Sequence, residues 1–220
     1  MVDRCQVDVI LPCLDEAAAL PGLLGRMPSG YRAIVVDNGS RDRSAEVAAG
    51  CGALVVTEPR RGYGAAVDTG LRAATADIVC VLDADGSLDP AALVQLVTLV
   101  ASGTAQLAVG RRIPVSRGAW PWHARAGNAL VAALLRRRGV PVHDIAPVRA
   151  ARRRDLLGLD VQDRAFGYPL ELLTRAAAAG WRIVERPVTY RRRATGTASK
   201  VSGSARGSLR AARDMARVLA

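Results

Sequence analysis

The sequence predicts an α/β fold with a mostly parallel central sheet and helices on both faces. Short runs of β-branched and other apolar residues alternate with stretches of helix length in the first half of the 220-residue chain. These runs are apolar throughout, as in strands that are buried on both faces. Apolar residues make up 50% of the chain, so one domain of this size can bury a substantial core.

The expected elements follow one another as strand, helix, strand, helix. We expect strands at residues 7–11, 33–36, 54–57, 78–82 and 107–109, and helices at residues 17–25, 44–50, 65–74 and 91–101. This alternation is typical of a parallel sheet covered on both faces. After Gly110 the pattern changes to arginine-rich turns, and we expect helices at 124–136 and 169–179 and a strand at 182–185.

No low-complexity linker divides the chain, so we expect a single domain at residues 1–203 and a terminal helix at 204–220. Four arginines of this last segment recur at spacings of four, three and four, and its leucines and alanines occupy another face. The pattern predicts a basic amphipathic helix. Such a helix can rest on an anionic bilayer, or it can pack its apolar face on the domain.

The formal charge of +11 would ordinarily favour nucleic acid or another anionic partner. Lys200 is the only lysine, so part of this charge reflects a general preference for arginine. Aromatic residues that could stack on bases are few, Phe166 is the only phenylalanine, and no nucleic-acid motif is present. We therefore expect no nucleic-acid partner, and the oligomeric state is left open.

The first residues do not have the form of a secretory signal, because Asp3 and Arg4 precede only a short apolar run. The uncharged segment 91–110 is broken by polar residues and does not qualify as a membrane span. We expect a cytoplasmic location, and the terminal helix leaves peripheral contact with the inner face of the membrane open.

Polar residues follow the expected strands at the points where each strand ends. Ligands bind beyond the carboxyl ends of the strands in such sheets. Asp83-Ala84-Asp85 directly follows the fourth strand, and its hard oxygen ligands suit Mg²⁺ or Mn²⁺. Taken alone, the motif is also compatible with a capped loop, because Asp-Gly and Asp-Pro pairs mark turns.

A glycine pair lies before the third helix. Arg61-Gly62-Tyr63-Gly64 places small residues where backbone N–H groups can approach a phosphate. It is not a dinucleotide fingerprint, because Val67 stands where the third glycine belongs and the motif follows the third strand instead of the first.

Together these segments resemble glycosyltransferase family 2 with the GT-A fold, and within it the polyprenyl-phosphate sugar synthases similar to dolichol-phosphate mannose synthase. The matching segments are residues 9–16 (VILPCLDE), 35–42 (VVDNGSRD), 62–66 (GYGAA), 83–86 (DADG) and 193–200 (RATGTASK). The resemblance implies a nucleotide-diphospho-sugar donor, either a UDP- or a GDP-sugar, and a bound Mg²⁺ or Mn²⁺.

The resemblance also implies roles for individual residues. Asp85, with Asp83 beside it, is expected to bind the metal, and Asp83 also to touch the ribose or phosphate side. The expected substrate-binding residues are Pro12, Asp15 and Glu16 in the nucleotide pocket, Asp37 at the base or ribose, Gly62 and Gly64 at the phosphates, and Arg193, Ser199 and Lys200 closing over them.

Three positions depart from the family's usual pattern. Asp15 stands where asparagine is usual, Tyr63 where lysine is frequent, and residues 146–148 where the family has Ser-Gly-Phe. The resemblance therefore leaves the donor base and the acceptor open.

Direct displacement with inversion is the expected reaction, because a metal and arginines can neutralise the leaving diphosphate without a covalent intermediate. A hydroxyl acceptor would need a general base, for which the candidates are Glu171 first, then Asp144 and Asp163. Glu171 can also simply complement a helix dipole. A polyprenyl phosphate acceptor would need no strong base, because it is already largely ionised at neutral pH.

Two other functions are compatible with parts of the sequence. A sugar-phosphate nucleotidyltransferase shares the sheet and the metal chemistry, but would carry a glycine-rich basic loop where this chain has Pro12 to Glu16. A catalytically degenerate module that binds a nucleotide sugar or a membrane is the other alternative.

Overall fold

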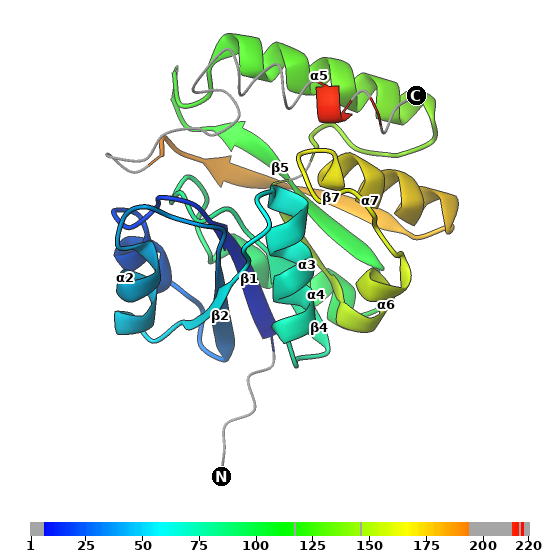
Figure 1. Cartoon of the computed structure of the whole chain (residues 1–220). Helices are drawn as coiled ribbons and strands as arrows, with labels where there is room; N and C mark the ends of the chain where they lie inside the picture. The colour runs from blue at the N-terminus through cyan, green and yellow to red at the C-terminus, as the bar shows by residue number, and fades with distance from the viewer. Residues whose placement is uncertain (1–6, 117, 146, 194–212, 216, 218–220) are drawn as a thin grey trace.

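The computed structural model describes residues 7–116, 118–145, 147–193, 213–215 and 217 (Figure 1). The strands are β1 (Val7–Cys13), β2 (Tyr31–Asp37), β3 (Leu54–Thr57), β4 (Ile78–Val81), β5 (Leu107–Pro114), β6 (Val148–Arg152) and β7 (Ile183–Tyr190). The helices are α1 (Leu20–Leu24), α2 (Ser44–Gly50), α3 (Tyr63–Ala73), α4 (Ala92–Ala101), α5 (Trp122–Arg137), α6 (Arg153–Gly158) and α7 (Tyr168–Ala178).

The strands form one seven-stranded sheet in the order β3-β2-β1-β4-β6-β5-β7. β6 runs antiparallel to both of its neighbours, and every other adjacent pair is parallel. The predicted mostly parallel α/β sheet is confirmed. The sequence pattern did not predict β6, because Arg149 and Arg152 interrupt its short apolar run.

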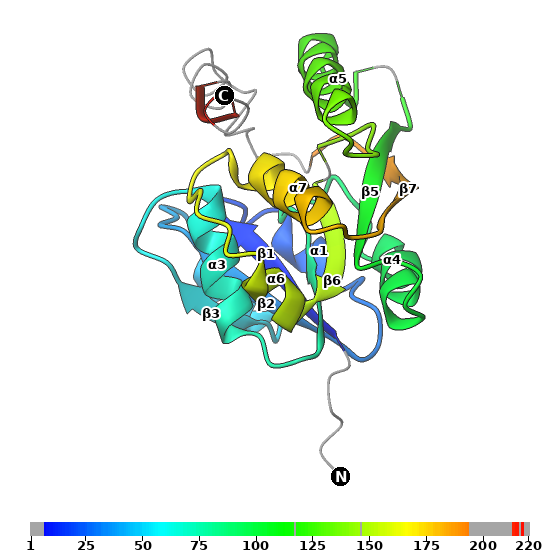
Figure 2. The same cartoon turned by 90° about the vertical axis from the view of Figure 1, so that its right-hand side faces the viewer.

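A hydrophobic core lies on each face of the sheet, as predicted. Val9 and Leu11 of β1 belong to the core beneath α1 and α4, whereas Ile10 belongs to the core beneath α3 and α7. This division follows from the alternation of side chains along a strand. Figure 2 shows α3, α6 and α7 together on one face.

α3 lies unusually close to β1. A Cβ atom at Gly70 would lie 2.4 Å from Cγ2 of Ile10 and 3.1 Å from Cγ2 of Val36. The helix can approach the sheet only because this position has no side chain.

The parallel strands bring their carboxyl ends to one edge of the sheet. Cys13 at the end of β1 pairs with Asp37 at the end of β2. Past the end of β4, the N–H of Leu82 donates to the carbonyl of Ile10 at 3.0 Å, so the chain runs on beside β1. Residues that follow these three strands therefore gather at one place.

No helix in the described part of the chain is long and apolar enough to cross a membrane. The predicted helix at 204–220 and the domain boundary before it fall largely outside the described residues. Residues 213–215 and 217 are helical, Asp214 is buried, and Arg217 lines an open groove of about 480 Å³ along α7. These residues lie against the domain.

Asp8 ties the first two strands to the turn before β4. Its side chain is fully buried and accepts hydrogen bonds from Arg32 Nε at 2.7 Å, Thr75 N at 2.6 Å and Ala76 N at 2.9 Å. Burial alone would raise the pKa of Asp8, but the bonds from Arg32, Ala76 and Thr75 outweigh it and hold the pKa below its usual value.

Asp8→Asn is expected to lower the free energy of unfolding at pH 7 by about 2 kcal/mol, because the half-buried Arg32 loses its charged partner and a neutral amide replaces the buried carboxylate that accepts from Thr75 and Ala76. Since the folded pKa is lowered, the wild-type stabilisation is present above the unfolded pKa of about 3.9 and is lost as pH falls through the folded pKa. Urea unfolding at pH 7 and at decreasing pH measures both effects.

The exposed Glu46→Gln variant is the matched control, since Glu46 forms only a surface pair with Arg43. The assignment fails if Asp8→Asn and the control unfold at the same urea concentration at pH 7.

Candidate donor site

Two carboxylates meet directly after β4. Ala84 is buried in the core, and Asp83 and Asp85 flank it. Asp85 is only 3% exposed; its Oδ1 accepts a hydrogen bond from Ser87 N at 2.9 Å, and its Oδ2 lies 2.9 Å from Arg193 Nε. Burial and the neighbouring charge of Asp85 raise the pKa of Asp83 to about 6, although nearby arginines oppose this shift.

The arginine that pairs with Asp85 follows β7, the strand at one edge of the sheet. Tyr190, the last residue of β7, forms an antiparallel bridge with Leu88, and the N–H of Arg191 donates to the carbonyl of Ser87 at 2.9 Å. These backbone contacts hold the end of β7 against the turn that follows the carboxylate pair. Arg193 therefore reaches Asp85 from a segment that the fold fixes in place.

The carboxylate pair fits a divalent cation that the substrate helps to hold. Both ligands are hard oxygens, and Asp85 already holds a cationic group, the guanidinium of Arg193. Among the described residues, no cluster of three or more His, Cys, Asp or Glu side chains could hold a metal ion. A metal at Asp83 and Asp85 would therefore need phosphate oxygens and water to complete its shell.

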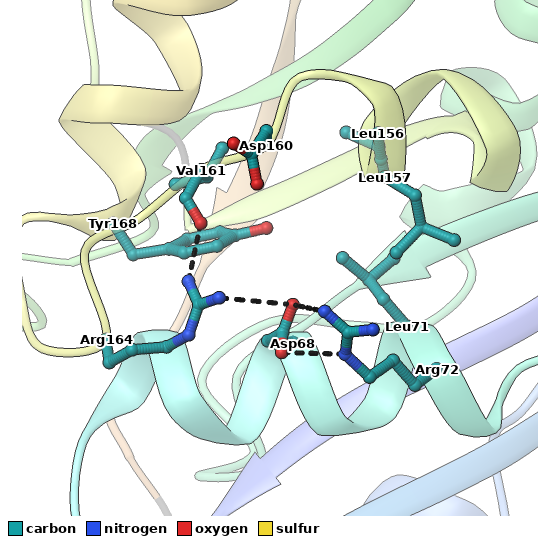
Figure 3. Close-up of a pocket in the computed structure, with 9 residues that line it drawn as sticks. All are labelled: Asp68, Leu71, Arg72, Leu156, Leu157, Asp160, Val161, Arg164 and Tyr168. Carbon is teal, nitrogen blue, oxygen red and sulfur yellow. Dashed lines mark hydrogen bonds and ion pairs between the residues drawn. The ribbon is translucent and has the colours of Figure 1, made fainter.

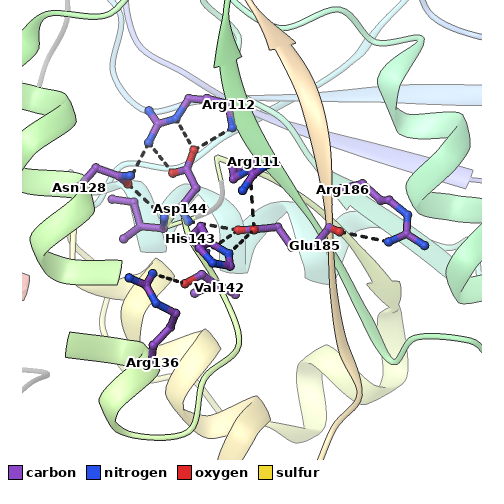
Figure 4. A network of polar contacts seen from close by, with 10 residues as sticks. Arg111, Arg112, Asn128, Arg136, Val142, His143, Asp144, Glu185 and Arg186 are labelled. Atoms are coloured by element: carbon purple, nitrogen blue, oxygen red, sulfur yellow. Dashed lines mark hydrogen bonds and ion pairs between the residues drawn. The ribbon is translucent and has the colours of Figure 1, made fainter. Parts of the chain in front are cut away.

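Arg112, in the carboxyl-terminal part of β5, is held from several sides (Figure 4), and its positive charge acts on Asp83. Its Nη2 lies 2.7 Å from Oδ1 of Asp144, and its Nε and backbone N–H both donate to Oδ2 of Asp144 at 2.9 Å. Its guanidinium lies 3.9 Å from the ring centroid of Trp120. Burial would lower the pKa of Arg112, but Asp144 raises it, so the group stays charged.

Glu185 of β7 holds Asp144 in turn. Its carboxylate accepts hydrogen bonds from the backbone N–H groups of His143 at 2.7 Å and Asp144 at 3.1 Å, and it contacts His143 Nδ1 at 2.9 Å (Figure 4). We expected Asp144 as a general-base candidate. In the structure it is 1% exposed and bonded to Arg112 through both oxygens, so it positions this arginine, and a role as base stays a prediction.

The carboxylate of Glu171, the first candidate for a base, also accepts hydrogen bonds from protein groups. Oε1 accepts hydrogen bonds from Gln162 N at 2.9 Å and Arg175 Nε at 2.6 Å, and Oε2 accepts one from Asp163 N at 2.6 Å. Burial would raise the pKa of Glu171, but these three donors lower it. Asp163 accepts a hydrogen bond from Ala165 N at 2.7 Å. This geometry favours a structural role for both carboxylates: Glu171 of α7 and Asp163 accept hydrogen bonds that hold the loop before α7.

The segment that holds Gly62 and Gly64 packs against the same loop before α7. Gly64 N donates to Ala165 O at 3.1 Å, and Ala65 N donates to Arg164 O at 3.0 Å. A Cβ at Gly62 would lie 2.1 Å from Arg164 O. In this structure the N–H groups of Gly64 and Ala65 are thus bonded to protein, and Gly62 N donates to Asn38 Oδ1 at 2.8 Å, so phosphate contacts at Gly62 and Gly64 stay a prediction.

The loops after β1 and β2 are linked to each other. Asp15, which has a left-handed φ of 55°, donates from its N–H to Ser40 Oγ at 3.0 Å and accepts from Arg41 N at 2.7 Å. Asp37 Oδ1 accepts from Ser40 N at 3.1 Å. The predicted pocket residues Asp15 and Asp37 therefore meet around Ser40.

Two further residues expected in the nucleotide pocket belong to the same edge. Pro12 lies in β1 beside Val36 of β2, and Glu16 is 6% exposed with its N–H donating to Ser44 Oγ at 2.9 Å. Ser199 and Lys200, expected to close over the phosphates, lie outside the described residues.

Three site residues were not assigned from the sequence. Arg112 lies in β5, beyond the expected strand at 107–109, and Trp120 follows β5; their positions after Gly110 were the available signal. Arg149 lies on β6, pairs in register with Val81 just before the carboxylates, and is 2% exposed. Its guanidinium lies 6.0 Å from the ring centroid of Tyr63, where the family usually has lysine.

A small cavity of about 30 Å³ lies elsewhere, between α3, α6 and Tyr168 (Figure 3). Its lining includes Asp68, which pairs with Arg72 at 3.0 Å and Arg164 at 3.7 Å. It is lined by none of the residues expected to bind the donor, and its volume suits about one water molecule.

Comparison with known proteins decides the family. The model described as glycosyl transferase family 2 matches residues 7–158. The chain belongs to this family. It is a nucleotide-sugar glycosyltransferase with the GT-A fold, as the resemblance implied, and this decides against the nucleotidyltransferase alternative.

Relatives and solved structures agree with this assignment. An uncharacterised glycosyltransferase of Mycobacterium tuberculosis is 56% identical over 214 residues, which cover 97% of each chain. The polyprenol monophosphomannose synthase of Mycolicibacterium smegmatis is 35% identical and aligns with 89% of this chain and 81% of its own. The dolichyl-phosphate hexose transferase of Haloferax volcanii is 32% identical, covering 84% and 83%.

Among solved structures, glucosyl-3-phosphoglycerate synthase from Mycobacterium tuberculosis has a TM-score of 0.76 at 23% identity. The match covers 97% of this chain and 79% of that one, and it shows the fold. The same synthase has been crystallised with Mg²⁺ and uridine diphosphate.

Glu171→Ala is expected to lower the free energy of unfolding by about 2 kcal/mol, because the N–H groups of Gln162 and Asp163 lose their acceptor. Glu171→Gln, which keeps one oxygen, should lose less. Chemical denaturation of both variants measures this. If Glu171→Ala keeps wild-type stability while its pH–rate profile loses the acidic limb, Glu171 is the base after all.

Arg193→Gln is expected to bind Mn²⁺ about fivefold more tightly without donor, because a partly buried ion pair worth ~1 kcal/mol no longer competes for Asp85. Titration calorimetry measures the affinity. Arg191→Gln is the control, since Arg191 pairs only at 4.0 Å with Asp89. Unchanged or weaker Mn²⁺ binding in Arg193→Gln would contradict competition at Asp85.

Proposed function

We propose that this glycosyltransferase moves a hexose, with inversion, from a UDP- or GDP-sugar to a polyprenyl phosphate in a reaction that depends on Mg²⁺ or Mn²⁺. The observation that carries the proposal is the meeting of Asp83 and Asp85 with three arginines at the carboxyl edge of the sheet. Arg193, Arg112 and Arg149 all lower the pKa of Asp83 through their charge. Such a site suits a metal and two phosphate-bearing ligands.

The donor would lie along the carboxyl edge of β1, β2 and β4. Asp15 and Asp37, joined through Ser40, would contact the base or ribose, with Pro12 and Glu16 in the same pocket. Asp83 and Asp85 would hold the metal, which neutralises charge on the diphosphate when bound. When a metal binds Asp85, it would displace Arg193, and Arg193 would then bind a phosphate oxygen. Ser199 and Lys200 remain proposed phosphate contacts.

Arg112 is the candidate for holding the acceptor phosphate. It is 14% exposed at the side chain, and Asp144 and Trp120 fix its direction. A guanidinium that is already oriented loses little freedom when it binds an anion. Its charge also acts on Asp83, so an acceptor phosphate at Arg112 would lie close to the donor diphosphate.

The state of the three base candidates supports an acceptor that needs no base. Asp144, Glu171 and Asp163 all accept hydrogen bonds from protein groups. A phosphate monoester is already ionised at neutral pH. In the proposed step one of its oxygens bonds to the anomeric carbon as the bond to the nucleoside diphosphate breaks on the opposite face. No proton has to be removed, and the configuration inverts.

Two relatives favour this acceptor class. One is named polyprenol monophosphomannose synthase and the other dolichyl-phosphate hexose transferase, and the chain aligns with more than four fifths of each, at 81% and 83%. This supports a lipid phosphate over a free hydroxyl as the acceptor.

The donor is tested by thermal stability against UDP-, GDP-, dTDP- and ADP-sugars with and without Mn²⁺. One nucleotide class should raise Tm by about 5 °C at roughly 100 times its Kd, because it binds only the folded state. Asp85→Asn should abolish the part that depends on Mn²⁺. No shift for any donor in a folded protein would favour the catalytically degenerate alternative.

The acceptor is tested with the donor found in this way. Sugar transfer to a short-chain polyprenyl phosphate in detergent is compared with transfer to the matching polyprenol and to phosphoglycerate, and NMR reports the anomeric configuration. We expect transfer only to the polyprenyl phosphate, with inversion. Equal transfer to the polyprenol, or a retained configuration, would overturn the proposal.

A further inference from the structure

α5 is a long helix with little of its surface buried. It spans 16 residues, and only Ala132 and Leu135 are buried. α7, with 11 residues, buries five. Most helical stability in proteins comes from packing an amphipathic face. Figures 1 and 2 show α5 at the edge of the molecule.

The outer face of α5 is apolar at its centre. At 100° per residue, Trp122, Leu130 and Ala133 fall within 80° of one another, opposite the buried Ala132 and Leu135 side of the helix. Trp122 is 80% exposed and Leu130 is 63% exposed. Large apolar side chains with this exposure on one helix face are unusual unless they meet a partner.

The strand and connection before α5 also carry exposed apolar side chains. Ile113 is 43% exposed and Val115 is 58% exposed. Of the six large exposed apolar side chains in the described part of the chain, four therefore fall between residues 113 and 130. The other two, Leu54 and Val94, lie on β3 and α4.

The same stretch of sequence carries only positive charge. No aspartate or glutamate occurs between Asp89 and Asp144, whereas this stretch holds seven arginines. Arg125 and Arg137 of α5 are exposed, as is Arg138 directly after it. We call Trp122, Leu130 and Arg137, which fall within 80° of one another around the helix, the α5 surface.

The α5 surface adjoins the proposed acceptor side of the site. Trp120, whose ring lies 3.9 Å from the Arg112 guanidinium, precedes Trp122 by two residues. A partner on this surface would therefore lie next to the arginine that faces Asp83.

We propose that the α5 surface binds the headgroup region of an anionic lipid bilayer. Exposed tryptophan and leucine on a helix rich in arginine and without acidic residues is the composition of an interfacial helix. A second copy of the chain fits less well, because it would bring two carboxylate-free arginine faces together. Nucleic acid would leave the aliphatic side chains exposed. The inference goes beyond the proposed function, because it requires neither donor nor acceptor.

The test is sedimentation of the full chain with phosphatidylcholine vesicles, with and without one quarter of phosphatidylglycerol, and with no polyprenyl phosphate present. We expect binding only to the anionic vesicles. Trp122→Ser should weaken it about tenfold through lost apolar contact. Arg137→Gln should weaken it about fivefold.

Leu54→Ser and Val94→Ser are the matched controls, because they remove exposed apolar side chains from other elements. They should bind as the wild type does. Tryptophan emission should shift to shorter wavelength on binding, and Trp122→Phe should abolish the shift while Trp181→Phe keeps it. Each variant is first shown to melt at the wild-type temperature.

Three outcomes would overturn the inference: no binding to anionic vesicles, equal loss in the control variants, or a dimer in sedimentation velocity that Trp122→Ser dissociates. Preferred binding of RNA, with no effect of Trp122→Ser, would point to nucleic acid instead. Sugar transfer in detergent should be unchanged in Trp122→Ser, so failure here and failure of the proposed function are distinguishable.

Discussion

The repulsion between Asp83 and Asp85 is the constraint around which the site is built. Asp85 is buried and Asp83 half-buried at the end of a buried strand, and burial together with the charge of Asp85 raises the pKa of Asp83 to about 6. In such surroundings neighbouring charges act strongly, because little solvent screens them. Three arginines from different strands and loops offset this negative charge. A bound divalent cation would offset it too.

Each arginine near the pair depends on a different part of the sheet. Arg149 is there because β6 inserts antiparallel beside β4, with Arg149 in register with Val81. Arg112 is there because Glu185 holds the loop that carries Asp144, and Asp144 holds Arg112. Arg193 is there because β7 is bonded to the turn after the pair. The second half of the chain thus supplies the positive charge, and the first half supplies the carboxylates.

This division explains how much could be predicted from the sequence. The strands of the first half and the Asp83-Ala84-Asp85 position were predictable, because continuous apolar runs and the carboxyl-edge rule depend on local sequence alone. β6 was not, because Arg149 and Arg152 make it look like a turn until its antiparallel partners are known. Glu171, Asp144 and the Gly62–Gly64 pair suggested chemistry by residue type, but their hydrogen-bond partners depend on loops that meet only in the folded chain. Arg112 stands just after the expected strand at 107–109, but its contacts depend on Asp144.

The bond between Arg191 and Ser87 also sets an order of assembly. It closes a loop of about a hundred residues, and contacts so distant in sequence form late because the chain must lose much freedom to make them. On the ribosome, β1, β2 and β4 emerge with both carboxylates well before β7 exists. A nascent or truncated chain that ends before β7 therefore displays an acidic edge without Arg193. The positive charge of Arg193 therefore reaches the carboxylate pair only when β7 docks beside β5.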